Sequence, residues 1–253
     1  DEGLALLIRP GMDTHTYEPT PADAKAVYEA DVLIYIGGTS DAWVEDMLTG
    51  APDVAAVRLM DSVRPLEEEH AEHGHEDVSY DEHIWTSPVN MRAMLASVAE
   101  SLCAADPQNA ETYRANAEAC DAELARLDQT FRDLVAGAAR TELVFADRFP
   151  LLYFARAYGL EYYAAWPGCA DEAEPSAATV TFLIDKVKEE GIPVVFHIEL
   201  SNEDMADIVC DETGAEKRLF SACHNVTRAQ FEEGVTYLEL MRQNVDVLRE
   251  ALG

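Results

Sequence analysis

Apolar residues follow a helical rhythm in one long stretch near the middle of the chain. Between residues 107 and 138 they recur in alternating steps of four and three, which keeps them on one face of a helix. They are Tyr113, Ala117, Cys120, Leu124, Leu127, Phe131 and Leu134. Pro107 suits the first turn of this helix and Gly137 favours its end. At about 1.5 Å per residue the helix would extend for about 45 Å, which is wider than one small domain.

A helix of this length belongs either to a coiled coil or to a protein in which it joins two lobes. Only this segment carries the seven-residue repeat, which favours the second interpretation. We therefore predict an N-terminal lobe (residues 1–105), a linking helix (106–138) and a C-terminal lobe (139–253).

Short apolar runs alternate with helical patterns on both sides of the long helix. Before it we predict strands at residues 4–8, 31–36 and 54–59, and helices at 21–30, 40–48 and 89–104. After it we predict strands at 143–146, 161–166, 194–199 and just before 221, and helices at 150–158, 177–190, 203–213 and 231–252. This alternation is typical of parallel sheets covered by helices. The predicted fold class is α/β, with two such lobes joined by one long helix.

Composition and charge narrow the class of ligand. An apolar content of 48% in 253 residues is that of a folded globular protein. The formal net charge of −31 argues against nucleic acid or an anionic membrane surface as a partner, and it suits a cation. No apolar run reaches the ~18 residues of a membrane span. The chain opens directly on a predicted strand without a signal-peptide pattern, which indicates a processed or trimmed end.

Three histidines stand in loops where an α/β fold places its ligands, beyond the carboxyl ends of strands. His15 follows the first predicted strand, His83 lies in the loop entering a helix, and His224 follows the last predicted strand. Imidazole is the commonest protein ligand for zinc, and three histidines with one open or carboxylate position form a stable zinc arrangement. The sequence therefore suggests a metal site between the two lobes.

Two of these histidines lie in longer motifs. Residues 11–21 (GMDTHTYEPTP) and 81–88 (DEHIWTSP) resemble the signature loops of the zinc/manganese solute-binding proteins of ABC transporters. The resemblance continues over nearly the whole chain, at residues 30–38 with Trp43, at Asp106-Pro107 and Tyr113, at 158–160, 174–176 and 213–215, and at Met241 and Asn244. Such proteins normally carry a further strand and helix ahead of the first strand, so this chain looks like an N-terminally shortened version.

The resemblance implies a function outside the cell. A protein of this family captures a divalent metal in the cleft between its lobes and delivers it to an ABC transporter permease. We expect the metal to be Zn²⁺ here, with Mn²⁺ or Fe²⁺ as the alternative. It implies a monomer that is periplasmic or a cell-surface lipoprotein, and that is not an enzyme. Two other classes stay open: a metallohydrolase, since three histidines and an open position can activate water, and a surface adhesin.

The resemblance also implies a set of ligands, with one departure. His15 and His83 would be the ligands from the N-terminal lobe. Ten residues before the tyrosine of the Tyr-Gly-Leu motif the family usually has a histidine, or a glutamate in manganese binders, but this chain has Arg148. Guanidinium stays protonated and offers no lone pair. We predict that His224 replaces the missing ligand, with Cys223 as the alternative.

Two further residues at strand ends keep several possible roles. Glu199 is predicted as a fourth ligand, as an acceptor that orients a histidine ring, or as an ion-pair partner of Arg148. Asp147 is a second candidate partner for Arg148. His197 alternates with apolar residues in a predicted strand, and we interpret it as a core histidine.

A loop rich in histidine and acidic residues precedes the second motif. His70, His73 and His75 lie within residues 67–77, where the only apolar residue is an alanine. The resemblance implies an accessory loop that holds zinc weakly near the mouth of the site, and imidazole favours zinc over manganese. The alternative is a solvated loop without a ligand.

Five cysteines are scattered along the chain without the close spacing of a zinc ribbon. Two disulfide pairs are possible in an exported protein, Cys103–Cys120 on consecutive helices and Cys169–Cys223 in loops of the C-terminal lobe. Cys210 is interpreted as a buried helix residue.

Overall fold

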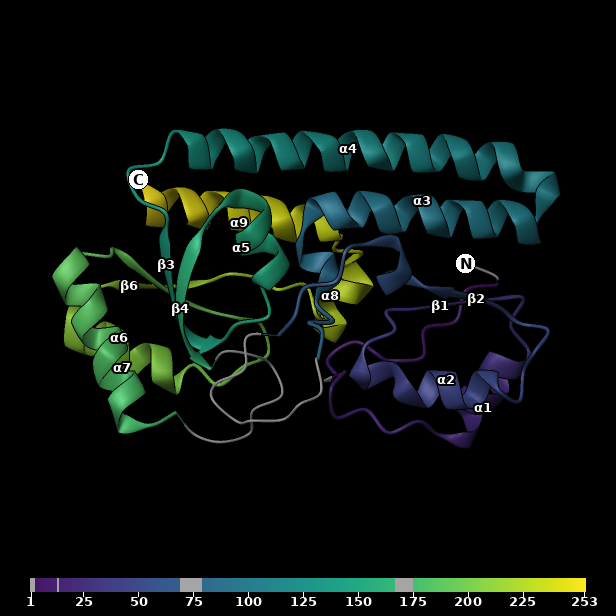
Figure 1. Ribbon diagram of the computed structural model, residues 1–253, viewed down its shortest axis with the longest axis horizontal. Coiled ribbons are helices and arrows are strands. Elements are labelled where there is room, and N and C mark those ends of the chain that lie inside the picture. Colours follow the sequence, from purple (N-terminus) through teal and green to yellow (C-terminus); the bar gives the residue numbers. More distant parts are fainter. Residues whose placement is uncertain (1–2, 13, 69–78, 167–174) are drawn as a thin grey trace.

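Two parallel sheets lie at opposite ends of an elongated molecule (Figure 1). The computed structural model describes residues 3–12, 14–68, 79–166 and 175–253. The smaller sheet pairs β1 (Val32–Tyr35) with β2 (Ala55–Arg58). The larger sheet has the order β4-β3-β5-β6, and its strands are β3 (Glu142–Arg148), β4 (Glu161–Trp166), β5 (Val194–His197) and β6 (Glu216–Leu219). Every strand pair is parallel, which confirms the predicted α/β class.

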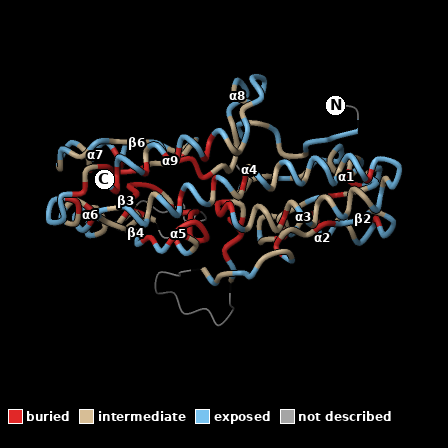
Figure 2. The backbone as a smooth tube through the Cα atoms, turned by 90° about the horizontal axis from the view of Figure 1, so that it is seen from above, coloured by how far each residue is buried: buried red, intermediate tan, exposed pale blue. Residues whose placement is uncertain are grey.

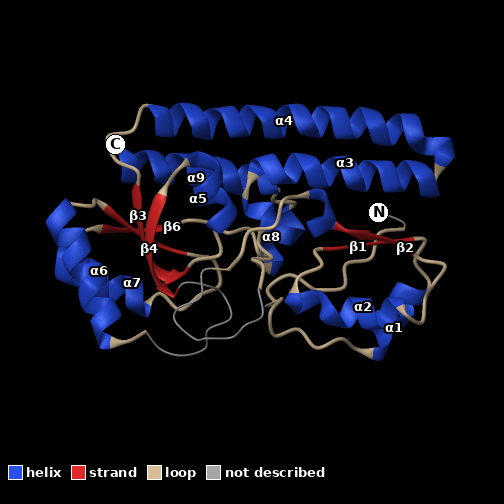
Figure 3. Cartoon of the chain, viewed as in Figure 1, coloured by secondary structure: helices blue, strands red, loops and turns tan. Residues whose placement is uncertain are grey.

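Helices cover both sheets and connect their strands (Figure 3). Those near the smaller sheet are α1 (Pro21–Tyr28), α2 (Ala42–Leu48) and α3 (Pro88–Ala105). Those after the long helix are α5 (Leu152–Tyr158), α6 (Ala177–Glu190), α7 (Asp204–Thr213), α8 (Arg228–Glu233) and α9 (Tyr237–Leu252). Successive strand residues face opposite sides of the larger sheet. Accordingly Val144 packs in a cluster with α6 and α7, whereas Phe145 packs in a cluster with α5 and α9.

The predicted long helix is α4 (Ala110–Ala136), preceded by a short 3-10 turn from Pro107 to Asn109. Its 27 residues span about 40 Å. It packs on α3 along one half and on α9 along the other, so that it runs along the top of the molecule past both sheets (Figure 1). Leu124, Leu127 and Phe131 of the predicted stripe are buried, and the remaining members of the stripe are half-buried. The apolar face therefore fixes how the helix lies on its neighbours.

Neighbouring acids on α4 also form ion pairs with both of its helical partners. Asp121 accepts two hydrogen bonds from Arg92 of α3, at 2.6 and 2.9 Å, and Glu123 accepts one at 2.8 Å from Arg242 of α9. Pairs as exposed as these contribute about 0–1 kcal/mol each. Their contribution is therefore small beside that of the buried apolar stripe.

The strand predicted at residues 4–8 is not formed. Leu4 and Leu6 are 81% and 59% exposed, and among the described residues no strand lies alongside this segment. An isolated apolar run cannot satisfy its backbone N–H and C=O groups in a ladder without a neighbouring strand. The prediction was wrong because hydrophobicity alone does not supply that neighbour.

The single closing helix predicted at residues 231–252 is also wrong, since the chain forms α8 and α9 instead. Gly234 ends α8 with φ = 74°, a left-handed conformation that favours glycine. Thr236 then caps α9: its hydroxyl accepts the N–H of Glu239, whose carboxylate accepts the N–H of Thr236. As a result α8 projects from the body of the molecule (Figure 2).

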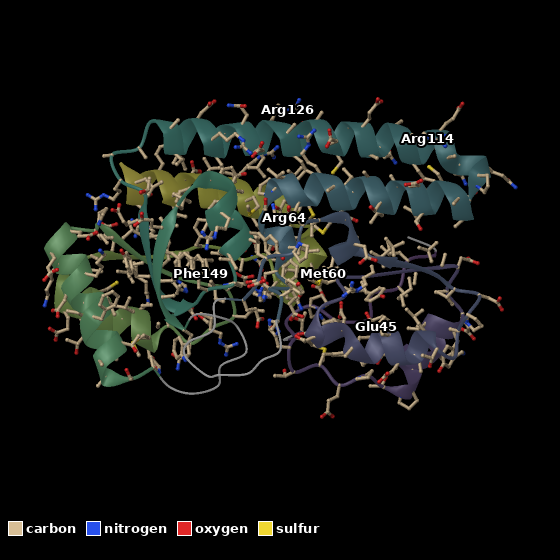
Figure 4. All side chains as sticks on the ribbon, in the orientation of Figure 1. Glu45, Met60, Arg64, Arg114, Arg126 and Phe149 are labelled. Atoms are coloured by element: carbon tan, nitrogen blue, oxygen red, sulfur yellow. The ribbon has the colours of Figure 1, made fainter. Side chains whose placement is uncertain are left out.

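A small buried cluster occupies the middle of the molecule. Met60, Ile84 and Met94 from the N-terminal half pack together with Tyr153 of α5. Figure 4 shows Met60 near the centre, and Phe149 among the side chains that fill the larger sheet's side of the molecule. The predicted domain boundaries, 1–105, 106–138 and 139–253, are not tested by this arrangement and stay a prediction.

Tyr153 carries the polar contacts of this central cluster. Its hydroxyl donates to the carbonyl oxygen of Asp81 at 2.8 Å and accepts the N–H of Leu66 at 3.0 Å. Its side chain is 4% exposed, and burial raises the pKa of the phenol to about 12. The hydroxyl therefore stays protonated and joins two backbone groups of one half to a helix of the other.

Tyr153→Phe is expected to lower the free energy of unfolding by about 1–3 kcal/mol, because two backbone groups lose their partner. In thermal unfolding followed by circular dichroism this corresponds to a fall of about 2–12 °C in Tm. Tyr80→Phe is the matched control, since Tyr80 is 45% exposed. Its Tm should change by no more than about 2 °C.

The stability difference between wild type and Tyr153→Phe should depend on pH in alkaline solution. The raised pKa of Tyr153 means that its contribution is fully present below about pH 10, where the phenol is also neutral in the unfolded chain. The contribution is lost as the pH rises toward 12. The difference in stability between wild type and Tyr153→Phe should therefore shrink over this interval, and a constant difference would contradict the assignment.

The cysteines in the described part of the chain are free thiols: Cys103, Cys120, Cys210 and Cys223. The possible Cys103–Cys120 disulfide is therefore absent, and Cys103 instead donates to the carbonyl oxygen of Ala110 at 3.5 Å. Cys169, the possible partner of Cys223, lies outside the described residues. Among the helices described, none is both long and apolar enough to cross a membrane.

Candidate metal centre

Three histidines from widely separated parts of the sequence meet between the two halves of the molecule. His15 comes from the loop before α1, His83 from the segment before α3, and His224 from the loop after β6. Their ring centroids are 4.8–5.5 Å apart. One nitrogen from each ring can be chosen so that the three lie within 4.8 Å of one another. The structure therefore brings together the histidines that the sequence suggested.

The spacing of these nitrogens fits a small tetrahedral ion. The Nε2 atoms of His15 and His83 are 3.3 Å apart. A tetrahedral zinc ion with Zn–N bonds of about 2.0–2.1 Å places two ligand nitrogens about 3.3–3.4 Å apart. His15 and His83 thus already stand at the separation that an ion between them requires, and His224 supplies the third nitrogen.

Asp81 orients the ring of His83. One of its carboxylate oxygens lies 2.9 Å from Nδ1 of His83 and also accepts the N–H of His83 at 2.7 Å. This contact places the proton on Nδ1 and leaves the lone pair of Nε2 directed toward His15. His83 is only 4% exposed, so this orientation is held within the interior.

Glu82 makes the corresponding contact with His15. Its Oε1 lies 3.0 Å from Nδ1 of His15, and the hydroxyl of Ser40 lies 2.9 Å from the same nitrogen. Burial raises the pKa of Glu82, but the hydrogen bonds from His15 and Ser40 outweigh burial and lower the pKa to about 2. Glu82 is therefore a carboxylate at neutral pH and a strong acceptor.

The loop that carries His224 is shaped by Glu199. One carboxylate oxygen of Glu199 accepts the N–H of Ala222 at 2.7 Å, and the other accepts the N–H of His224 at 2.7 Å. Between them Cys223 has φ = 55°, a conformation that is uncommon for a residue with a side chain. The two hydrogen bonds hold the loop in this conformation, so that His224 faces the other histidines.

Trp85 links the two halves directly beside the histidines. Its indole N–H donates to the carbonyl oxygen of Ala222 at 2.9 Å, and its own carbonyl accepts the hydroxyl of Tyr237 at 3.0 Å. Its ring packs edge-on against His83 and His224, with centroids 5.3 Å away in each case. Trp85 therefore closes one side of the group with an apolar wall.

His224 lies in a poorly solvated position. Burial lowers the pKa of its ring well below the ordinary value; His83, His15 and Arg148 lower the pKa further, and Glu82 opposes this in part. The ring is therefore neutral at physiological pH. A neutral imidazole is the form that binds a metal.

Asp147 and His197 lie near the ends of β3 and β5. Asp147 accepts the N–H of Ile198 at 2.9 Å and the hydroxyl of Ser201, while the N–H of Arg148 donates to its other oxygen at 2.8 Å. His197 is partly buried at the end of β5, and its Nδ1 lies 3.3 Å from the carbonyl oxygen of Ile198.

Two predictions in this region are not decided by the structure. Burial raises the pKa of the Cys223 thiol to about 12. The role of Glu199 as a fourth ligand and that of Cys223 as the alternative to His224 remain predictions. His70, His73 and His75 of the predicted accessory loop lie outside the described residues.

Known proteins are similar to this chain in both sequence and fold. The zinc-uptake family ZnuA, described as "Zinc-uptake complex component A periplasmic", matches residues 3–251. This chain belongs to that family of solute-binding proteins. The high-affinity zinc uptake system protein ZnuA of Bacillus subtilis is 29% identical over 262 residues, covering 100% of this chain and 82% of the relative. The zinc-binding protein AdcA of Streptococcus pyogenes is 26% identical over 268 residues, and this chain spans 52% of its length.

Solved structures agree with the sequence comparison. The Zn(II)-bound ZnuA-like domain of Streptococcus pneumoniae AdcA superposes with a TM-score of 0.80 at 26% identity, covering 97% of this chain and 89% of that domain. The metal-dependent lipoprotein YcdH of Bacillus subtilis superposes with a TM-score of 0.83 at 26% identity, covering 98% and 90% of the two chains. The predicted resemblance to metal-binding proteins of ABC transporters is thereby confirmed.

Sequence reasoning missed the residues that orient the histidines. Asp81 and Glu82 stand directly before His83, and Ser40 follows the Gly37-Gly38 turn. The contact of Asp81 could have been predicted, because Asp81 stands two positions before His83, the histidine that it contacts. Nothing in the local sequence indicates that Glu82 contacts a histidine 67 positions earlier, which only the fold brings close.

Proposed function

We propose that this protein captures Zn²⁺ through His15, His83 and His224 and delivers it to the permease of an ABC transporter outside the cytoplasm. The protein would be periplasmic or a cell-surface lipoprotein, and would act as a carrier and not as an enzyme; the family description names a periplasmic component, and YcdH is named a lipoprotein. Glu199 would hold the loop of His224, and the region of His70, His73 and His75 would serve as an accessory zinc-binding loop.

The observation that carries this proposal is the convergence of three imidazoles at zinc-compatible spacing. A set of nitrogen ligands favours zinc, whereas manganese prefers oxygen. Two of the rings have a carboxylate on Nδ1, the usual arrangement of a zinc-binding histidine. The names of the family and of the relatives support zinc independently of the geometry.

The geometry gives less support to the metallohydrolase alternative. A hydrolase needs an acid that faces the open position of the metal and acts as a general base. The carboxylates of Asp81 and Glu82 contact His83 and His15, and that of Glu199 accepts two backbone N–H groups. Each of these acids is already engaged in positioning a ligand.

Calorimetric titration of the metal-free protein should show one zinc ion bound tightly per chain. His15→Ala and His83→Ala should each abolish this binding, since each variant keeps only two of the three histidines and zinc sites in proteins have at least three protein ligands. Crystals grown with zinc should give an anomalous peak at the zinc edge between the three rings. A peak elsewhere, or tight binding of Mn²⁺ in preference to Zn²⁺, would contradict the proposal.

A further inference from the structure

The carboxylate of Glu82 lies in a turn that is built to receive it. The turn follows β1 and contains Gly38, Thr39 and Ser40. Oε2 of Glu82 accepts the N–H of Ser40 at 3.0 Å and lies 3.5 Å from the hydroxyl of Thr39. Oε1 accepts the hydroxyl of Ser40. Both oxygens are thus engaged by a segment more than 40 positions earlier in the chain.

Gly38 provides the space for this side chain. A Cβ atom added at Gly38 would overlap the Oε2 and Cβ atoms of Glu82. The backbone of Gly38 has φ = −83°, which other residues adopt without strain. The absence of a side chain at this position is therefore required by the approach of Glu82 and not by the backbone conformation.

The same carboxylate fixes the ring of His15. Oε1 of Glu82 is 3.0 Å from Nδ1 of His15, on the side of the ring away from Nε2, which faces His83. An ionised carboxylate can only accept, so the proton of the neutral ring lies on Nδ1 and the lone pair lies on Nε2. Within the described residues, the group of potential ligand atoms consists of the three histidines, so Glu82 orients a ligand and does not join the set.

We propose that Glu82, held in the turn of Gly38 to Ser40, is a positioning residue that sets the tautomer and orientation of His15 for metal capture. The inference rests on the proposed zinc function of the three histidines. Glu82 and His83 are adjacent in the chain, so one segment supplies one ligand and orients another. Movement of that segment would then change both N-terminal ligands together.

Glu82→Gln tests the proposal with little change in size. An amide has one acceptor oxygen in place of two, so its NH₂ group must face either the N–H of Ser40 or the Nδ1 of His15. In the first case two donors, the amide NH₂ group and the N–H of Ser40, face each other. In the second case the ring of His15 favours the tautomer with its proton on Nε2, so the nitrogen that faces His83 has no lone pair for the metal. Zinc affinity measured by calorimetry should fall by about 10–100-fold. Glu100→Gln makes the same change of charge at an exposed position of α3 and should leave the affinity unchanged.

Gly38→Ala perturbs the same contact from the other side. The new methyl group displaces Glu82 without touching a histidine, so it should also lower zinc affinity by about 10–100-fold. Gly137→Ala is the control, because a Cβ there meets only ordinary contacts at 3.6 Å or more. Both changes disrupt the same interaction, the contact of Glu82 with His15. The double variant Glu82→Gln/Gly38→Ala should therefore lose no more zinc affinity than the weaker-binding of the two single variants.

A second measurement does not depend on zinc. Long-range ¹⁵N–¹H correlation spectra of the metal-free protein report which nitrogen of His15 carries the proton. Wild type should show protonated Nδ1, and Glu82→Gln should shift the ring toward protonated Nε2. An unchanged tautomer together with zinc affinity within about threefold of wild type would overturn the role of Glu82 while leaving the zinc site intact. Absence of zinc binding by wild type would instead refute the proposed function, and the spectra would still decide the tautomer.

Discussion

Replacement of His224 by alanine is expected to lower zinc affinity by more than about 100-fold, beyond the loss typical of a residue that only orients a ligand. The reason is that the group of potential ligand atoms among the described residues consists of the three histidines, so the remaining set would be His15 and His83 alone. Arg148 cannot replace His224, because a guanidinium offers no lone pair. Competition with a chromophoric chelator of known affinity would measure the change.

Two variants separate this role from alternatives in the same region. His197→Ala removes a partly buried histidine outside the group and should leave zinc affinity unchanged. Cys223→Ser tests the neighbouring thiol, which is predicted only as the alternative ligand, and should retain most of the affinity. If Cys223→Ser abolished zinc binding while His224→Ala did not, the assignment of the third ligand would have to be exchanged.

Replacement of Phe131 by alanine should destabilise the fold more than any of the substitutions at the metal centre. Phe131 is fully buried on α4, and its ring packs against those of Phe154 and Tyr158, with centroids 4.9 and 5.2 Å away. Truncating a buried phenylalanine costs about 3–5 kcal/mol. For a chain of this size the Tm should fall by about 6–20 °C in calorimetry or circular dichroism.

Phe231 provides the matched control for this prediction. It lies on α8 and is 54% exposed, so Phe231→Ala should change the free energy of unfolding by no more than about 0.5 kcal/mol. Saturating zinc should raise the Tm of Phe131→Ala, because a ligand that binds only the folded state stabilises it by mass action. A Tm for Phe131→Ala within about 2 °C of wild type would show that α4 does not depend on its buried face.

The place of His224 was predictable from topology, because residues that follow parallel strands gather at the carboxyl edge of the sheet. The place of His15 was not, since the strand predicted at residues 4–8 is not formed; the resemblance of residues 11–21 to a signature loop indicated its role instead. The rhythm of Leu124, Leu127 and Phe131 likewise predicted a long helix with one buried face, and that face is buried. The buried face of α4 and the place of His224 needed only the helical spacing of apolar residues and the rule that ligand-binding residues follow parallel strands.

The predictions that failed depended on neighbours that the local sequence does not specify. The run at residues 4–8 has the composition of a strand but no described strand beside it. Gly234 and the capping pair Thr236 and Glu239 are sequence signals for the break between α8 and α9. The prediction missed the break because the apolar spacing on both sides is compatible with one continuous helix. The contact of Glu82 with His15 arises only when the turn after β1 is folded against the second motif.

The long helix α4 has a consequence for how a loaded protein is recognised. It contains neither glycine nor proline between Ala110 and Ala136, and it packs on helices from both halves of the molecule. A helix packed in this way resists a wide swing of the two halves, so we expect the loops of His15, His83 and His224 to accommodate the ion. Under the proposed function, the transporter would then distinguish loaded from empty protein by the surface shape around these loops.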